Sequence, residues 1–233
     1  MNEELNNQIK VLELFSGFEC MSNAFRERGC QCFTVDYDER FPSDLHKDIR
    51  DITAEKILEI FGKPDIIFLG TDCTTYSVAA IGRHRTKEPS GNLAPKTEKA
   101  RIADELNIHC IELVRQLNPI IQIWENPVGA LRKMNFMQPI PYINTTTYCQ
   151  YGFSYRKATD FFSNIDLHLK PPCKNGDPCH EKASRGARTG LQAIKDPALK
   201  AIYPPELCKD IVDECLKVIS SGEKPLLFKE LND

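Results

Sequence analysis

The chain has 233 residues, 41% of them apolar and 27% charged, and a formal net charge of −3. This length and apolar content predict one main domain with a sizeable core, and the charge argues against a protein that coats nucleic acid nonspecifically. No apolar run approaches the ~20 residues that cross a bilayer, and residues 1–5 lack the basic start of a signal peptide. We therefore expect a soluble, intracellular protein that does not contact a membrane.

Short apolar runs alternate with helical patterns from residue 9 to about residue 134. The pattern predicts strands at 9–15, 32–35, 65–69 and 120–124, and helices at 21–28, 53–61 and 96–117. Such alternation implies crossover connections, and so a doubly wound, Rossmann-like α/β fold with a parallel sheet. Ligands of such folds bind at the carboxyl ends of the strands.

The residues at these strand ends are suited to chemistry. The first strand ends in Phe15-Ser16-Gly17, which alone is weak evidence for a nucleotide site because it has a single glycine. The second ends in Asp36-Tyr37, where the carboxylate either accepts hydrogen bonds from ribose hydroxyls or caps a helix. The third leads through Gly70 to Cys73, which is either a nucleophile or a buried apolar residue. The fourth ends in Glu125-Asn126-Pro127.

In this order the motifs resemble those of the DNA cytosine-C5 methyltransferases. Cys73 with Tyr76-Ser77 resembles the nucleophile loop of that family, and Glu125-Asn126-Pro127 resembles its Glu-Asn-Val motif. The motif Asp48-Ile49 resembles the pair that contacts adenine. The cofactor-binding residues implied by the resemblance are Phe15, Ser16, Gly17, Asp36, Tyr37, Asp48, Ile49 and Gly70.

The later part of the chain continues the resemblance. Residues 148–152 and 156–160 fall at the basic motif of the family, and residues 202–207 fall near its closing helix. The whole pattern is similar to the compact methylase-like proteins of bacteriophages and prophages. It implies a catalytic and cofactor-binding domain at 1–146, a small substrate-recognition lobe at 147–200, and a C-terminal helix at 201–233 that returns to the catalytic domain.

The resemblance implies an S-adenosylmethionine-dependent methyltransferase fold and methyl transfer to C5 of cytosine in DNA. Cytosine C5 is a poor nucleophile, so the thiolate of Cys73 would add to C6, while Glu125 would give a proton or a hydrogen bond to N3. The ten cysteines, spread along a chain without a signal peptide, favour reduced thiols. The compartment expected from these features is the cytoplasm of a bacterial host cell.

The target nucleotide must be flipped out of a duplex or be single-stranded already, so loops have to hold it. The basic segment after Cys73, at 74–96, is a candidate clamp on the phosphates. Arg156 and Lys157 are candidates of equal weight for substrate contacts or for surface ion pairs. The full set of expected substrate contacts is Ser77, Arg83, Arg85, Asn126, Arg156, Lys157 and Arg188.

Three substitutions distinguish the chain from the family pattern. Thr71-Asp72 replaces two prolines before the nucleophile, and the adjacent carboxylate should raise the pKa of Cys73. Glu19-Cys20 replaces glycines of the cofactor loop. Lys157 and Thr159 stand where two arginines are common.

Only about forty residues separate Asp160 from the closing helix, so the long recognition domain of typical members is missing. Three alternatives follow for target recognition. Residues 171–192 read a short DNA sequence, or a homodimer or partner subunit supplies the recognition, or the protein is almost nonspecific. Two other functions remain open: a catalytically idle DNA-binding relative, and a regulatory partner of another methylase.

The same short region holds Cys173, Cys179 and His180, which together with Cys149 could bind zinc. Their spacing is not one of the common structural zinc patterns. We therefore expect ordinary packing or a DNA-facing loop in preference, and assign no metal ligand.

Overall fold

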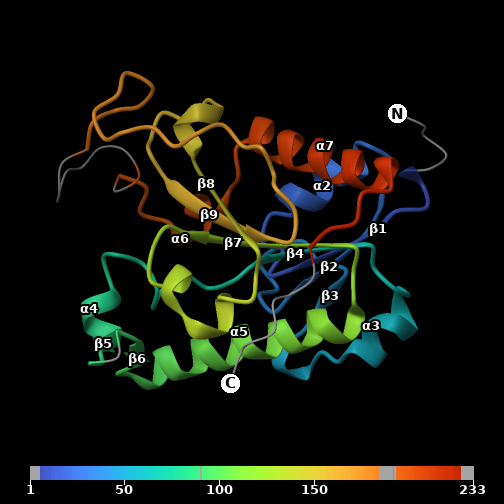
Figure 1. Ribbon diagram of the computed structural model, residues 1–233, viewed down its shortest axis with the longest axis horizontal. Helices are drawn as coiled ribbons and strands as arrows, with labels where there is room; N and C mark the ends of the chain where they lie inside the picture. Colours follow the sequence, from blue (N-terminus) through green and yellow to red (C-terminus); the bar gives the residue numbers. More distant parts are fainter. Residues whose placement is uncertain (1–5, 90, 184–190, 192, 227–233) are drawn as a thin grey trace.

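The computed structural model describes residues 6–89, 91–183, 191 and 193–226. A seven-stranded sheet of order β3-β2-β1-β4-β7-β9-β8 forms its centre (Figure 1). The parallel part contains β1 (Lys10–Leu14), β2 (Gln31–Asp36), β3 (Leu45–His46), β4 (Ile66–Gly70) and β7 (Ile121–Pro127). Strand β9 (Ala158–Ser163) runs antiparallel to both of its neighbours, β7 and β8 (Tyr142–Thr147).

Helices cover both faces of the sheet (Figure 1). On one face lie α2 (Cys20–Arg26) and α7 (Pro205–Ser221), and on the other lie α3 (Ala54–Ile60) and α5 (Glu98–Leu117). The seven expected elements all form within a few residues of their predicted bounds, so the doubly wound α/β class is confirmed. Within the described ranges, no helix has both the length and the apolar character needed to span a membrane.

Shorter elements fill the connections. They are α4 (Ile81–His84), α6 (Pro197–Ala201), the hairpin of β5 (Arg85–Lys87) and β6 (Leu93–Pro95), and the 3-10 turns η1 (Ile49–Asp51), η2 (Leu131–Lys133), η3 (Asn135–Met137) and η4 (Tyr148–Tyr151).

Alternation along the strands divides the core into two layers. Leu12 and Leu14 of β1 face α3 and α5, whereas Val11 faces α2 and α7. The long helix α5 begins at an N-cap, because the Thr97 hydroxyl accepts a hydrogen bond from the Ala100 amide, 3.3 Å away. It ends at Asn118, whose φ of 45° is the left-handed conformation common after a helix.

The expected boundary between residues 146 and 147 does not divide the sheet from a separate lobe. It falls at the end of β8, and β9, which the sequence analysis assigned to the lobe, is a strand of the main sheet. The hydrogen-bonded register joins Glu125 of β7 to Phe161 of β9. The chain therefore returns to the central sheet before the irregular segment that follows residue 163.

A buried carboxyl group in β1 makes stability depend on pH. Glu13 accepts a hydrogen bond from the Ser22 amide (2.8 Å), and burial is the main cause that raises its pKa from 4.5 to about 7. The pKa of Glu13 is higher in the folded state than in the unfolded state. The contribution of this group to the free energy of unfolding is therefore fully present below pH 4.5 and is lost as the pH rises through 7.

We expect the free energy of unfolding of Glu13→Gln, relative to that of the parent, to be higher at pH 8 than at pH 4. Glutamine keeps an oxygen for the Ser22 amide but cannot ionise. The gain between the two pH values should reach about 3 kcal/mol in the free energy of unfolding. Denaturant titrations of both proteins at each pH measure it. A difference between variant and parent that is the same at pH 4 and pH 8 would contradict the prediction.

Candidate active site

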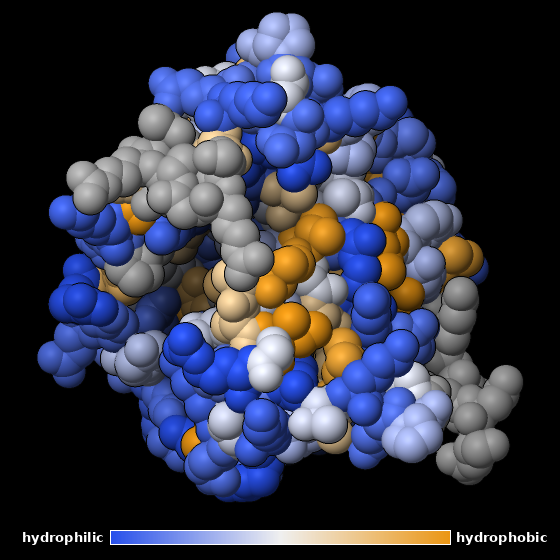
Figure 2. All heavy atoms as spheres, turned by 90° about the vertical axis from the view of Figure 1, so that its left-hand side faces the viewer, coloured by the Kyte–Doolittle hydropathy of each residue, from blue (hydrophilic) through white to orange (hydrophobic). Residues whose placement is uncertain are grey.

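The carboxyl ends of β4 and β7 bring the two expected catalytic residues to one edge of the sheet. Gly70, the last residue of β4, is paired in register with Glu125 of β7, and Cys73 follows three residues after Gly70. Figure 2 shows the molecule from the left-hand side of Figure 1, where the loop after β4 leads to α4. Apolar side chains gather there in a hollow, with hydrophilic side chains around it.

The loop that carries Cys73 is anchored to the loop after β7. The Asn126 side chain donates to the Thr71 carbonyl (3.0 Å), and the Ala130 amide donates to the Tyr76 carbonyl (2.7 Å). Asn126 is fully buried and holds the nucleophile loop, so its expected role as a substrate contact stays a prediction. Gly129 permits this close approach, because a Cβ there would lie 2.3 Å from the Tyr76 carbonyl oxygen.

A buried ion pair holds the other side of the same loop. Arg85 donates to both carboxylate oxygens of Asp104 (2.7 and 3.1 Å), and its guanidinium lies 4.1 Å from the centre of the Tyr76 ring. The Tyr76 hydroxyl donates to Asp104 (2.6 Å). The Arg85 side chain has no exposed surface, so the prediction that it contacts DNA phosphates is wrong. It fixes the loop instead.

The surroundings of Cys73 disfavour its thiolate in the free protein. Burial, Glu125 and Asp72, in that order, raise the pKa of the Cys73 thiol to about 11, and Lys157 opposes them. The expected effect of Asp72 is therefore present but is not the largest. The Asp72 carboxylate accepts hydrogen bonds from the Thr74 amide (3.0 Å) and hydroxyl (2.5 Å), so it also shapes the loop.

Three polar groups hold the Glu125 carboxylate. The hydroxyls of Tyr148 and Tyr203 lie 3.4 and 3.3 Å from its two oxygens, and the Lys157 ammonium lies 3.5 Å away. Burial and the charge of Glu125 raise the pKa of both phenols well above their usual range, so they stay protonated donors. Neither tyrosine was among the site residues expected from the sequence.

A cavity of about 420 Å³ lies beside the loop that carries Cys73. Five of the eight expected cofactor-binding residues line it: Phe15, Asp36, Tyr37, Asp48 and Ile49. The other residues that line the cavity were not among the expected cofactor contacts: Val35, Lys47, Arg50, Asp72, Thr74, Lys99 and Leu106. Apolar walls and a carboxylate fit the adenine and the ribose of S-adenosylmethionine. Since Asp72 and Thr74 also line it, the cavity reaches the nucleophile loop.

The loop between β1 and α2 closes one end of this cavity. Asp36 joins it to β2, because its carboxylate accepts hydrogen bonds from the amides of Gly17 (2.8 Å) and Asp38 (2.9 Å). Glu19, where the family has a glycine, adopts a left-handed φ of 54° and is held by Thr34 (2.6 Å) and Arg26 (2.8 Å). The buried hydroxyl of Ser16 has no hydrogen-bond partner among the described residues.

Asp48 is already paired at the cavity edge. Its carboxylate accepts two hydrogen bonds from the Arg50 guanidinium (2.6 and 3.0 Å), which lower the pKa of Asp48. Gly70 lies under the site, where an added Cβ would stand 2.8 Å from the Tyr203 hydroxyl.

The remaining expected substrate contacts differ in their exposure. Arg83 of α4 is exposed, and the Ser77 amide donates to the Cys73 carbonyl (3.0 Å). Arg156 donates to the Cys173 carbonyl (3.2 Å from both Nε and Nη2), and Lys157 is buried beside Glu125. Among the described residues, therefore, neither side chain forms an ion pair at the surface. Arg188 lies outside the described residues.

The parallel sheet with one antiparallel strand, β9, between β7 and β8, and the cavity at its carboxyl edge, define an α/β, Rossmann-like methyltransferase fold. Methyltransferases of this fold use S-adenosylmethionine. No profile of a known protein family matches the chain.

Among curated proteins, the chain is similar to the type II methyltransferase M.BbvI of Brevibacillus brevis, with 27% identity over 124 residues. These residues make up 53% of this chain and only 29% of that protein. The chain is therefore similar to a methyltransferase over about half of its own length, and its place among the DNA cytosine methyltransferases stays a prediction.

Solved structures similar to part of the chain include a DNA modification methyltransferase encoded within an E. coli prophage, with 19% identity and a TM-score of 0.47. That match covers 67% of this chain and 46% of the other. A second is the methyltransferase EhMeth of Entamoeba histolytica, with 13% identity, a TM-score of 0.49, and coverage of 70% and 55%.

Proposed function

We propose that this protein transfers a methyl group from S-adenosylmethionine to C5 of cytosine in DNA, through a covalent bond between Cys73 and C6. One observation carries the proposal: a thiol and a carboxylate meet at the ends of two adjacent strands, beside a cavity that has an acid for a ribose. Bound there, S-adenosylmethionine would supply an electrophilic methyl group.

Because the pKa of Cys73 is raised to about 11, addition of its sulfur needs a proton acceptor, and Glu125, whose charge acts on this thiol, is our candidate. As the sulfur bonds to C6, the thiol proton passes to the Glu125 carboxylate, and the carboxyl group protonates N3 of the ring. This neutralises the negative charge that would build up in the base and makes C5 nucleophilic. After methylation a base removes the C5 proton, the sulfur leaves C6, and N3 returns its proton. No side chain is assigned as that base.

The groups around Glu125 support this role. Tyr148, Tyr203 and Lys157 all donate toward its carboxylate, so they orient it and stabilise its charge before the substrate arrives. A carboxylate held in this way can turn one oxygen toward a flipped cytosine. Lys157, which is buried there, would then act at the base rather than on the DNA phosphates.

DNA binding by this chain stays a prediction. Arg83 follows the nucleophile loop and is exposed, which supports the prediction that it contacts a phosphate next to a flipped base. Target recognition by a homodimer or a partner subunit, and a cytoplasmic location, also stay predictions. The pKa of Cys73 near 11 favours the idle DNA-binding alternative, because little thiolate exists at neutral pH.

Base-resolved sequencing of DNA from a host that lacks its own methylases, with and without this protein, tests the function. We expect 5-methylcytosine only in cells that express the protein. Methylation at an adenine or at an exocyclic amine would contradict the proposal. DNA binding without any modified base would favour the idle relative.

Cofactor binding should depend on Asp36. We expect Asp36→Ala to weaken binding of S-adenosylmethionine by roughly 10- to 100-fold, because the charge-assisted hydrogen bond to ribose and the anchor of Gly17 are lost together. Isothermal titration calorimetry measures the dissociation constant. Asp38→Ala is the matched control, since Asp38 pairs with Arg40 and does not line the cavity. Equal constants for Asp36→Ala and the parent would show that the second strand end has been misassigned.

A further inference from the structure

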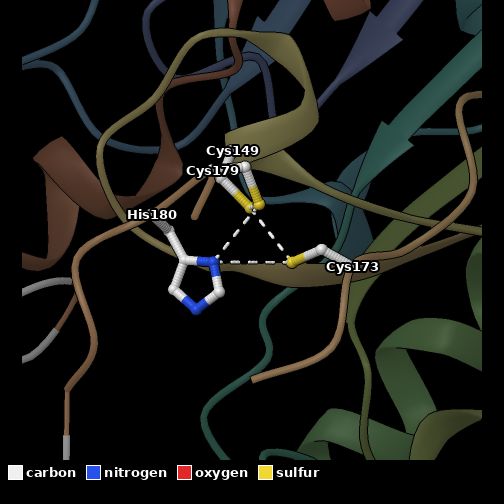
Figure 3. Close-up of side chains that lie close together, drawn as sticks. All are labelled: Cys149, Cys173, Cys179 and His180. Carbon is white, nitrogen blue, oxygen red and sulfur yellow. Dashed lines mark hydrogen bonds between the residues drawn. The ribbon is translucent and has the colours of Figure 1, made fainter. Parts of the chain in front are cut away.

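Four side chains outside the candidate active site converge on one point. The sulfur atoms of Cys149, Cys173 and Cys179 and Nδ1 of His180 all lie within 4.8 Å of one another. Figure 3 shows the four side chains pointing inward toward a common centre. Cys149 lies in η4, and the other three lie in the irregular segment after β9.

We propose that these four residues form a structural Zn²⁺ site. Tetrahedral zinc with three thiolates and one imidazole needs sulfur–sulfur separations of about 3.8 Å and sulfur–nitrogen separations of about 3.6 Å. Cys149 lies 3.3 Å from Cys173 and 3.6 Å from Cys179, sulfur to sulfur. The His180 Nδ1 lies 3.6 Å from the Cys173 sulfur and 3.4 Å from the Cys179 sulfur. These four edges are close to those of a zinc tetrahedron.

Zinc explains the convergence of these four side chains better than a disulfide bond or simple packing does. All three cysteines are free thiols, and a disulfide bond would be about 2.05 Å long and would leave one thiol over. Thiols are weak hydrogen-bond donors, so packing alone gives no reason for three of them to meet an imidazole nitrogen. Cys149 and Cys173 are also buried. Zinc explains both the residue types and their convergence.

The charges around the cluster suit a metal centre. Binding Zn²⁺ deprotonates three thiols, releases three protons to solvent and leaves a net charge of −1. The Arg156 guanidinium, which donates to the Cys173 carbonyl, brings a positive charge close to that anion. Coordination through Nδ1 leaves the His180 proton on Nε2, so the 3.3 Å contact from the Gly176 amide to Nε2 is given up.

The site would fasten an irregular segment to the sheet. Residues 164–183 contain no helix or strand, whereas η4 lies between β8 and β9. A metal that joins the two replaces the core that so short a segment cannot build. Cys149 follows Tyr148, whose hydroxyl reaches Glu125, so zinc would also steady this donor. That last consequence rests on the proposed function.

Metal analysis of the whole protein tests the site without DNA or cofactor. Protein purified under reducing conditions without chelator should hold roughly one zinc ion per chain. After exchange, Co²⁺ should give the intense visible bands of tetrahedral thiolate coordination. Chelation should lower the midpoint of thermal unfolding, and added Zn²⁺ should restore it. Folded protein that holds no zinc and gives no tetrahedral Co²⁺ spectrum would overturn the proposal.

Two variants locate the metal. Cys179→Ala should weaken Zn²⁺ binding by at least about tenfold in competition with a chromophoric chelator, whereas Cys32→Ala, outside the cluster, should not. If Cys179→Ala fails to fold, the Co²⁺ titration of the parent carries the test. Equal zinc affinity in folded Cys179→Ala and parent would refute the assignment. A protein that contains zinc but does not methylate DNA would contradict only the proposed function. A protein that methylates DNA but contains no zinc would contradict only the zinc site.

Discussion

Cys73→Ser should abolish methyl transfer and leave cofactor binding within about twofold of the parent. A serine hydroxyl fits the same loop but is a far weaker nucleophile at neutral pH, so we expect the rate to fall by roughly three orders of magnitude or more. The anchors of the loop, at Thr71 and Tyr76, do not involve the thiol. Single-turnover transfer of a labelled methyl group, together with calorimetry of cofactor binding, measures both quantities.

Cys32→Ser is the control for a general effect of replacing a cysteine. Cys32 lies in β2 and its thiol contacts the Ser22 carbonyl (3.4 Å). That variant should transfer methyl groups at close to the parental rate. Equal product formation by Cys73→Ser and the parent would remove Cys73 from the chemistry.

Glu125→Gln should have opposite effects on two properties of the site. Removing the negative charge lowers the pKa of Cys73, so alkylation of this thiol by iodoacetamide at pH 8 should become faster. Methyl transfer should become roughly 10²- to 10⁴-fold slower, because glutamine cannot carry a proton to N3. Alkylation mapped by mass spectrometry and single-turnover rates give the two results. A slower alkylation, or an unchanged rate of transfer, would contradict the proposed role of Glu125.

Asp72→Asn separates charge from proton transfer. It also removes a negative charge that raises the pKa of Cys73, and it keeps an oxygen for the Thr74 amide and hydroxyl. Alkylation should again become faster, but methyl transfer should hold or rise. A large loss of transfer in the folded variant would instead make Asp72 a participant in the reaction.

The first part of the fold was predictable because buried parallel strands have nearly continuous apolar sequences. The run at 66–69 is an example, and its four residues are almost completely buried in β4. Strand β8 could not be found in this way. Its sequence, Tyr-Ile-Asn-Thr-Thr-Thr, lies at the sheet edge, is mostly polar and resembles a loop. Its strand character depends on pairing with β9, which follows it in the chain and pairs with it from Thr147 and Ala158 onward.

Site residues at the ends of strands could be predicted from the sequence. Site residues whose roles depend on buried partners elsewhere in the chain could not. Phe15, Asp36 and Ile49 line one cavity because successive parallel strands end at the same edge. Arg85 was misassigned because its role depends on Asp104, a partner on α5 that no local pattern identifies. Tyr203 reaches Glu125 across 78 positions of sequence, so only the docked position of the C-terminal segment reveals it.

Covalent trapping on DNA that contains 5-fluorocytosine tests the central claim most directly. Fluorine at C5 cannot be removed as a proton, so the bond between the sulfur and C6 persists after methyl transfer. With S-adenosylmethionine present, the proposed mechanism predicts a protein–DNA complex that survives denaturation, with the modified base attached to Cys73. The Cys73→Ser variant should form no such complex. A methylated product without any adduct, or an adduct on another residue, would contradict the mechanism.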